Sequence, residues 1–408
     1  MVKRPNVLNR DDDGAGEVQL PDPGLMRRLP LFTDILEAAY RRIPRRVGGY
    51  FLGGADSEGG LAENCAAFQR IRLVPRYGVD LSQRTSRADL FGRTYSAPIG
   101  VAPLGYSSAI WPGSEQALAT AAQRANVPYI TSMFAIEPLD NIIRYAPDVA
   151  WMQLYYFKDK QPSLDVIERA KRAGYKVLVL TVDSPVYSKR TRDHRNGMQF
   201  PPVVTPSLLA EVAMTPRWSL EYLKRPHPLP GNLMPYTLDP QGGTKALQEF
   251  LARTQIEAIG LGEFAEVRKA WPGTLVVKGL QHPKDAEAAV AAGADGIIVS
   301  NHGGRQFDAA PAAIDSLPAI VDAAGGKVPV MLDSGVRSGL DVVRALVRGA
   351  HFCFAGRPFL ATCAAAGDAG RGARHAMGLF HDEIATALGQ LGAASPAALR
   401  GDRGREWR

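Results

Sequence analysis

The segment SNHGGRQFD (residues 300–308) places a histidine three positions before an arginine. Histidine is a natural general base near neutral pH, and a neighbouring carboxylate raises its basicity and fixes its tautomer. Arg305 offers a planar fork suited to a carboxylate. Asp333 ends the next predicted strand, so we expect it to be the carboxylate beside His302. The pattern predicts a site in which His302 removes a proton from a ligand whose carboxylate is bound by Arg305. The alternative is a His–Asp pair with a purely structural role.

Two glycine- and arginine-containing segments, DSGVRSG and AGRPF, follow the last two predicted strands. Gly335 and Gly356 let the backbone approach a ligand closely. Arg337 and Arg357 add positive charge. Loops at these positions of an α/β barrel commonly bind phosphate through backbone amides and a helix N-terminus, so we predict a phosphate site here.

Lys278 ends a strand so apolar (LVVK) that its side chain is expected at the rim of the sheet. It could act as a Schiff-base nucleophile or as a cation beside a developing anion. The residues alone leave both roles open.

The elements that position these residues repeat a simple theme, a short apolar strand followed by an amphipathic helical segment. This alternation predicts a parallel sheet buried on both faces. Eight units favour a closed (β/α)₈ TIM barrel, whose active site lies where the strands end. The predicted strands are residues 97–103, 128–132, 150–155, 176–183, 274–279, 295–301, 328–333 and 351–356.

The domain organisation follows from composition. Residues 1–28 are polar and are expected to be disordered or extended. Residues 29–390 form the barrel domain, which begins with a helical segment. The connection after the fourth strand is unusually long, and its part near 195–245 is predicted to be a lid, with a decorated surface loop as the alternative. Residues 391–408 are expected to be a flexible basic tail.

Composition narrows the class of protein. The net charge of +7 favours anionic partners, but no basic helix with interleaved aromatics is present, so nucleic-acid binding is not expected. Three scattered cysteines predict neither a disulfide framework nor a metal site. Without a signal peptide or an apolar run of membrane-spanning length, the cytoplasm is the expected location.

SNHGGRQ, together with VVKG before it and DSGVR and GRP after it, resembles the FMN-dependent L-2-hydroxy acid oxidase/dehydrogenase family, which includes glycolate oxidase, lactate oxidase and dehydrogenase, and mandelate dehydrogenase. The resemblance runs from about residue 37 to 390. It implies that FMN binds at the barrel end and that a small L-2-hydroxy acid is oxidised to the 2-oxo acid. The alternatives are another phosphate-binding barrel enzyme, an isomerase or aldolase, and a non-catalytic FMN-binding protein.

The same resemblance assigns roles to individual residues. His302 is the base, supported by Asp333, and Lys278 is the cation near the flavin. The substrate ligands are Tyr50, Tyr155, Arg190 and Arg305. The residues that contact the flavin are Pro103, Leu104, Gly105, Ser132, Gln153, Thr181, Lys278, Ser300, Asp333, Ser334, Gly335, Arg337, Gly356 and Arg357.

The chain departs from the family at two of these loops. Leu104 stands where the family usually has threonine, and Phe134 stands where glycolate oxidase has tryptophan. A backbone contact at Leu104 would be kept, whereas Phe134 leaves the size of the substrate open. The resemblance also implies a homo-oligomer, a tetramer, and the basic surface favours contact with the inner face of a membrane. We expect a quinone or cytochrome as electron acceptor rather than oxygen.

Overall fold

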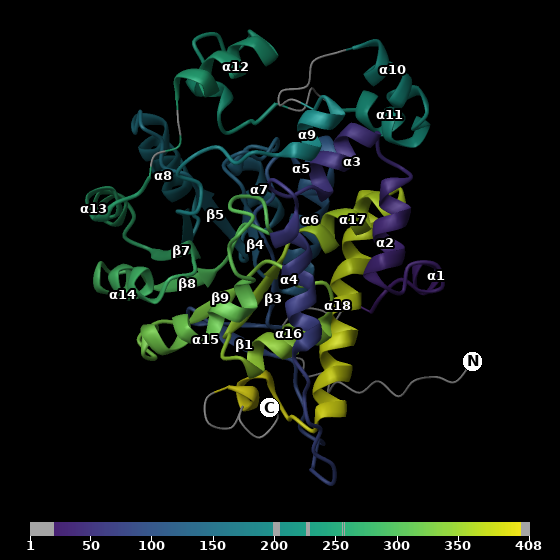
Figure 1. The fold of residues 1–408 in the computed structure, drawn as a ribbon, viewed down its shortest axis with the longest axis vertical. Helices are drawn as coiled ribbons and strands as arrows, with labels where there is room; N and C mark the ends of the chain where they lie inside the picture. Colours follow the sequence, from purple (N-terminus) through teal and green to yellow (C-terminus); the bar gives the residue numbers. More distant parts are fainter. Residues whose placement is uncertain (1–19, 199–204, 226–228, 255, 257, 401–408) are drawn as a thin grey trace.

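Eight parallel strands close into a barrel, which confirms the predicted (β/α)₈ fold (Figure 1). The structure is a computed structural model that describes residues 20–198, 205–225, 229–254, 256 and 258–400. Around the barrel the order is β10-β3-β4-β5-β6-β7-β8-β9, so the last strand pairs with the first. The strands are β3 (Ile99–Val101), β4 (Tyr129–Thr131), β5 (Ala150–Leu154), β6 (Val177–Thr181), β7 (Thr274–Leu280), β8 (Gly296–Val299), β9 (Val330–Leu332) and β10 (Phe352–Ala355).

The strands are apolar because both of their faces are covered. Every residue of β5, β6 and β10 is buried, as expected for strands that fill the barrel on one side and support helices on the other. The covering helices are α6 (Ser114–Ala125), α7 (Leu139–Tyr145), α8 (Gln161–Ala173), α13 (Leu261–Ala270), α14 (Pro283–Ala291), α15 (Ala313–Ala324), α16 (Gly339–Val347), α17 (Arg357–Ala366) and α18 (Ala369–Leu391).

The end of the barrel at which the strands begin is closed by a hairpin, β1 (Ala88–Leu90) and β2 (Arg93–Tyr95). Phe91 at its turn has a positive φ of 50° and packs on Trp151 at a centroid distance of 5.7 Å. The chemistry is therefore left to the opposite end.

The N-terminal region differs in part from the expectation. It forms α1 (Pro23–Met26), α2 (Phe32–Tyr40), α3 (Arg45–Leu52) and α4 (Gly59–Arg70). The helix α1 falls inside the segment expected to be disordered or extended. The Asp22 carboxylate caps it and pairs with Arg371 at 2.8 Å, while Leu25 is buried. Residues 1–19 lie outside the described residues.

The C-terminal segment also differs from the expected tail. After α18 the chain forms a 3₁₀ turn, η2 (Pro396–Leu399), and Leu399 is buried. Local hydrophobic packing therefore orders part of a segment that its charge alone suggested would be loose. Residues 401–408 are not described.

The long connection between β6 and β7 is largely helical. It contains α9 (Thr191–Asn196), α10 (Pro206–Ala213), α11 (Pro216–Leu223), η1 (Met234–Tyr236) and α12 (Gly243–Arg253). Figure 1 shows α10, α11 and α12 at one end of the molecule. The helix α9 packs against α3, which also contacts the short helix α5 (Ser107–Ile110). Within the predicted lid, residues 199–204 and 226–228 lie outside the described part. No helix among the described residues is long and apolar enough to cross a membrane.

Candidate active site

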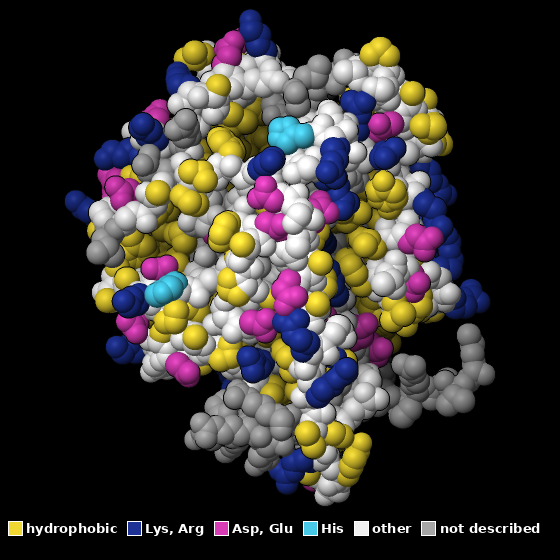
Figure 2. Space-filling view, viewed as in Figure 1, with side chains coloured by type: hydrophobic (Ala, Val, Ile, Leu, Met, Phe, Trp, Pro, Cys, Tyr) yellow, Lys and Arg dark blue, Asp and Glu magenta, His cyan; other side chains and the backbone are white. Residues whose placement is uncertain are grey.

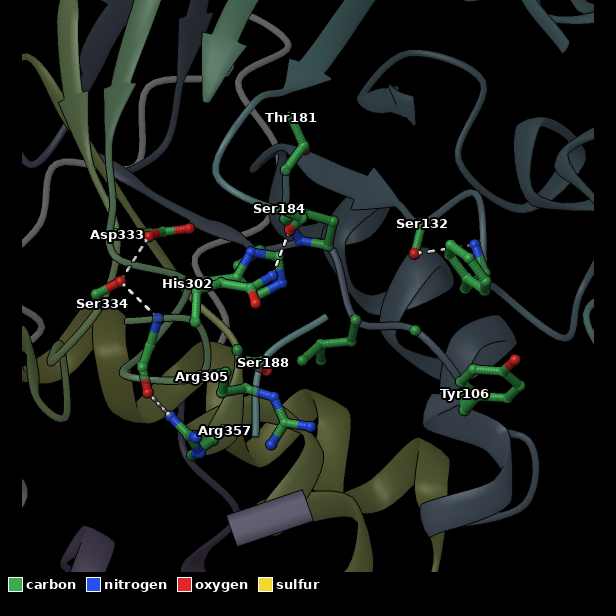
Figure 3. Close-up of a pocket in the computed structure, with 18 of the residues that line it drawn as sticks. Tyr106, Ser132, Thr181, Ser184, Ser188, His302, Arg305, Asp333, Ser334 and Arg357 are labelled. Carbon is green, nitrogen blue, oxygen red and sulfur yellow. Dashed lines mark hydrogen bonds between the residues drawn. The ribbon is translucent and has the colours of Figure 1, made fainter. Parts of the chain in front are cut away.

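A cavity of about 630 Å³ lies where the strands end (Figure 3). This volume is typical of sites for small molecules and cofactors. All eight barrel strands contribute to its lining, through Lys278 within β7 and through residues at or after the ends of the others, joined by Tyr50 of α3 and Asp193 of α9. Of the site residues predicted from the sequence, all but Ser300 line this one cavity. Ser300 lies just beneath the cavity surface, where its hydroxyl contacts Lys278 at 3.0 Å.

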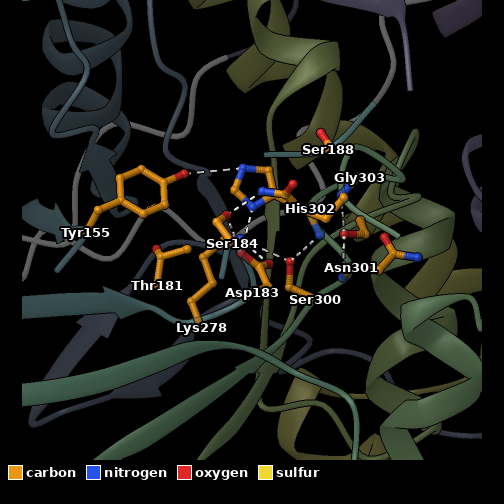
Figure 4. A network of polar contacts seen from close by, with 12 residues as sticks. Tyr155, Thr181, Asp183, Ser184, Ser188, Lys278, Ser300, Asn301, His302 and Gly303 are labelled. Carbon is orange, nitrogen blue, oxygen red and sulfur yellow. Dashed lines mark hydrogen bonds and ion pairs between the residues drawn. The ribbon is translucent and has the colours of Figure 1, made fainter. Parts of the chain in front are cut away.

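His302 is held by a different carboxylate from the one expected. Its Nδ1 lies 2.8 Å from Oδ1 of Asp183, which follows β6 (Figure 4). Asp333, the predicted partner, instead accepts a hydrogen bond from Ser334 and lies 3.4 Å from Lys278. His302 has a positive φ of 58°, a conformation rare outside glycine. It lies three residues beyond β8, and its ring meets a residue that follows β6 instead of one that follows the neighbouring β9.

This contact determines how the imidazole can act. A carboxylate at Nδ1 favours the tautomer in which Nδ1 carries the proton, and this leaves the lone pair on Nε2. Nε2 faces the cavity, 3.4 Å from the Tyr155 hydroxyl. His302 is therefore arranged to accept a proton at Nε2 from a ligand in the cavity.

The ionisation states suit that role. Burial lowers the pKa of His302 below its ordinary value of 6.5, and the opposing influence of Asp183 does not cancel this effect. Burial would raise the pKa of Asp183, but His302 and Lys278 outweigh it and bring the pKa to about 2. At neutral pH the pair is thus a neutral imidazole beside an ionised carboxylate.

Lys278 lies at the floor of the cavity as a buried cation. Its ammonium lies 3.4 Å from Asp333 and 3.7 Å from Asp183. Burial would lower the pKa of Lys278, but these two carboxylates raise it above its ordinary value. A lysine that stays protonated is a poor nucleophile, so the geometry favours the role of a fixed positive charge over that of a Schiff base.

Two arginines flank the ring of Tyr50 at the cavity wall. The guanidinium of Arg305 lies 4.8 Å from the ring centroid and that of Arg190 lies 5.6 Å away. Arg305 also donates to the carbonyls of Tyr50 and Gly53, at 2.7 and 2.9 Å, which ties it to the end of α3. Burial and the nearby Arg190 lower the pKa of Arg305 to about 10, so Arg305 remains charged at neutral pH. The two positive charges suit a ligand carboxylate.

The predicted phosphate loops lie together on the other side of the cavity. Arg357 begins α17, whose N-terminal end points at a site suited to an anion. Its guanidinium donates to the carbonyls of Gly53 and Gly303, both at 2.9 Å, so it also braces the loop after β8 against the end of α3. Arg337 lies over the ring of Phe32 and lines the same part of the cavity.

Three buried polar side chains form a further wall of the cavity. Ser132 donates to the amide oxygen of Gln153 at 3.2 Å, and the amide nitrogen of Gln153 donates to Thr181 at 3.1 Å. The three residues come from neighbouring strands, and each is at most 4 % exposed. They form a fixed row of donors and acceptors that could read the edge of a planar ligand.

Comparison with known proteins agrees with this geometry. Residues 39–405 match the family model described as FMN-dependent dehydrogenase. The chain belongs to the FMN-dependent dehydrogenase family. It is 37 % identical to an L-lactate dehydrogenase of Alcaligenes faecalis over 87 % of this chain and 93 % of that protein. An L-lactate dehydrogenase of Ectopseudomonas mendocina is also 37 % identical, over 91 % and 97 %.

Solved structures show the same relationship for this FMN-dependent dehydrogenase. The monotopic membrane protein (S)-mandelate dehydrogenase superposes with a TM-score of 0.86 at 32 % identity, covering 91 % of this chain and 98 % of that one. A mandelate oxidase superposes with a TM-score of 0.78 at 32 % identity, over 93 % and 97 %. The family indicated by SNHGGRQ and its companion motifs and the barrel predicted from the eight strand–helix units are thus confirmed, and neither the isomerase or aldolase nor the non-catalytic alternative is favoured.

The residues of the cavity fit FMN. The end lined by Arg337, Arg357 and the start of α17 has the charge and the backbone donors that a phosphate needs. The row formed by Ser132, Gln153 and Thr181 supplies neutral hydrogen-bonding groups for a heterocycle, with the Lys278 cation close by. The cavity wall also leaves little room for a side chain at position 356, because a Cβ on Gly356 would lie 2.9 Å from the Leu104 side chain.

Sequence reasoning missed several residues of the cavity. Asp183 was visible in LTVDSP as a carboxylate that ends a strand, and only its direction was unknown. The excursion after β6 contributes Met198, Leu251 and Ile256 to the lining, the last two beyond the predicted lid boundary. No periodicity marks such contacts, since they depend on how a long connection folds back.

Proposed function

We propose that this FMN-dependent dehydrogenase oxidises the hydroxyl-bearing carbon of a 2-hydroxy acid. The observation that carries the proposal is a base and a carboxylate clamp facing the same cavity. His302 presents Nε2 to that cavity, and the Arg190–Tyr50–Arg305 wall borders it. An acid bound by the arginines presents its α-carbon and hydroxyl to the imidazole.

FMN, when bound, supplies the acceptor for two electrons. The chain supplies binding, orientation and a proton acceptor. Arg190 and Arg305 hold the substrate carboxylate and thereby fix the orientation of the α-carbon and hydroxyl relative to His302. His302 accepts a proton from the CH–OH group at Nε2, and Asp183 stabilises the resulting imidazolium. Lys278 places a permanent positive charge where negative charge builds up on oxidation.

The apolar part of the cavity supports an uncharged side chain on the substrate. Phe134, Leu251 and Ile256 line it together with Met198. An alkyl or aryl group packs well against such a wall, while a second carboxylate would be desolvated there without a partner. We propose an L-2-hydroxy acid of the lactate or mandelate type.

Anaerobic stopped-flow spectroscopy of the purified protein tests this function. We expect a yellow protein that releases FMN on denaturation and whose flavin is bleached by L-lactate or (S)-mandelate but not by D-lactate. Reoxidation by a soluble quinone is expected to outpace reoxidation by oxygen, as proposed for a dehydrogenase. If no 2-hydroxy acid bleaches the flavin, the proposal is wrong. Rapid air reoxidation with stoichiometric peroxide would instead assign an oxidase.

We also propose that α10 and α11 contact the surface of a membrane. Exposed apolar side chains project from both helices and from the turn between them: Leu209, Met214, Leu220 and Leu223 are 57 to 80 % exposed. Figure 2 shows hydrophobic side chains gathered at the corner where these helices lie. The Trp218 indole donates to the Ile110 carbonyl at 2.9 Å and anchors α11 to the barrel. The apolar side chains therefore face outward from a fixed base, and the net charge of +7 suits anionic lipid.

Vesicle flotation tests this surface. The protein is expected to float with vesicles that contain anionic phosphatidylglycerol. The triple variant Leu209→Ser, Leu220→Ser, Leu223→Ser is expected to remain in the dense fraction with its activity on soluble acceptors intact. Leu31→Ser removes a comparably exposed leucine just before α2 and serves as the control. Flotation of the triple variant at the wild-type level would contradict the proposal.

A further inference from the structure

Glu115 is a fully buried carboxylate outside the cavity lining. It lies in the first turn of α6 and is 0 % exposed. Its hydrogen-bond donors are all uncharged: the Ser107 hydroxyl and the backbone N–H groups of Ser108, Ile136 and Glu137. Burying a carboxylate without a neighbouring cation costs free energy unless its oxygens accept enough hydrogen bonds. The burial of Glu115 therefore indicates a specific role for this carboxylate.

The four donors fit an ionised carboxylate. Oε1 accepts from Ser107 at 2.9 Å, from Ser108 at 3.3 Å and from Ile136 at 3.2 Å, and Oε2 accepts from Glu137 at 2.6 Å. Burial raises the pKa of Glu115, while these bonds oppose the rise. A protonated carboxyl would direct an O–H at a neighbouring donor. The position in the first turn of a helix also favours negative charge.

The donors belong to two different loops of the cavity wall. One loop follows β3, spans residues 104–108 and contributes Gly105 and Tyr106 to the lining. The other follows β4, spans residues 132–137 and contributes Ser132 and Phe134, whose ring centroid lies 6.0 Å from that of Tyr106. We call these the β3 loop and the β4 loop. Glu115 is therefore a bridge behind the wall that the substrate and the cofactor share.

The two loops touch in front of this bridge. The Tyr106 N–H donates to the Phe134 carbonyl at 3.0 Å, and a Cβ on Gly105 would lie only 3.1 Å from that of Phe134. The Phe134 ring packs edge-on against Tyr155, 5.5 Å between centroids. A shift of the β4 loop thus moves Phe134 relative to a residue that contacts His302.

We propose that Glu115 is a positioning residue that fixes the spacing of the β3 and β4 loops and thereby the size of the pocket for the substrate side chain. The inference rests on the proposed function, since it concerns how the same cavity selects its substrate. His302 and Asp183 follow β8 and β6, and Lys278 lies in β7, so Glu115 acts on the fit of the substrate rather than on the proton acceptor.

The variant Glu115→Gln tests the proposal because it keeps the shape and removes one acceptor. With its oxygen on the Ser107 side, its NH₂ group opposes the Glu137 N–H and pushes the β4 loop away. We expect KM for 2-hydroxy acids to rise roughly 10- to 100-fold with kcat changed far less, as for a misplaced wall. The ratio of kcat/KM for L-lactate to that for (S)-mandelate is expected to change. The visible circular dichroism of the bound flavin, which needs no turnover, is expected to change as well.

Two further variants separate positioning from stability. Ser107→Ala removes one donor to Glu115 and is expected to shift KM in the same direction by a smaller factor, even if Glu115→Gln does not fold. Ser96→Ala loses a buried hydrogen bond to the Ala125 carbonyl at the far end of the barrel. It is expected to lower the Tm alone.

The outcomes are distinguishable from failure of the proposed function. If no 2-hydroxy acid reduces the wild-type flavin, the proposed function is wrong, and circular dichroism still tests Glu115. If Glu115→Gln and Ser107→Ala lower the Tm but keep the wild-type KM, substrate ratio and dichroism, Glu115 only stabilises the fold and the inference is overturned.

Discussion

Replacing His302 with glutamine is expected to slow reduction of the bound flavin by roughly 10²- to 10⁴-fold. Glutamine keeps the approximate size and hydrogen-bonding capacity of histidine but cannot accept a proton near neutral pH. FMN is expected to remain bound, because Gln153, Arg337 and Arg357 follow other strands. The measurement is single-turnover bleaching at saturating substrate, which separates the proton step from binding.

The matched control is His282→Gln, since His282 is exposed and caps α14 away from the cavity. It is expected to bleach at the wild-type rate. Near wild-type bleaching by the His302→Gln variant would mean that the base is another group. His194 and Asp193, which also line the cavity, would then be the residues to replace.

The second large effect is expected for Asp183→Asn, on the order of 10²- to 10⁴-fold in the same measurement. Asparagine can still contact His302 but carries no charge to stabilise the imidazolium. Asp333→Asn is the matched comparison, because Asp333 contacts Lys278 and Ser334 instead. We expect it to slow bleaching much less. The reverse order would restore Asp333 as the partner of the base.

The pH dependence of kcat/KM gives the same assignment an independent test. The neutral imidazole is the active form, so activity is expected to fall as the pH drops through the pKa of His302, which lies below 6.5. Asp183 raises that pKa through its charge. Its removal therefore lowers the pKa further, and the acid limb of Asp183→Asn is expected to move to lower pH. An acid limb of Asp183→Asn that moves to higher pH would contradict the contact between Asp183 and His302.

The sequence identifies which residues reach the cavity better than it identifies which of them touch. Apolar strands followed by helices specify a parallel barrel, and the carboxyl ends of parallel strands meet at one end. That logic placed His302, Lys278 and Asp333 together. It could not choose between two carboxylates at strand ends, because the choice depends on the left-handed backbone of His302.

The sequence also could not predict which residues of a long connection reach the cavity. The excess length after β6 predicted a covering element, yet Leu251 and Ile256 reach the cavity from beyond the expected boundary. The Glu115 bridge was equally hidden. An acidic residue in the first turn of a helix is common and usually solvated, and only its burial marks it as unusual.

The hydrogen bonds from Arg357 to the end of α3, the helix that carries Tyr50, have a consequence for synthesis of the chain. Tyr50 is made early, but Arg357, which donates to the carbonyls of Phe51 and Gly53 at the end of α3, is made only after the last strand, β10. β10 must also pair with β3 before the barrel can close. Because domains emerge from the ribosome N-terminus first, a nascent chain that stops short of β10 contains Tyr50, Arg190 and Arg305 but lacks Arg357, which braces the end of α3 that carries Tyr50. The substrate wall is therefore completed only when translation is nearly finished.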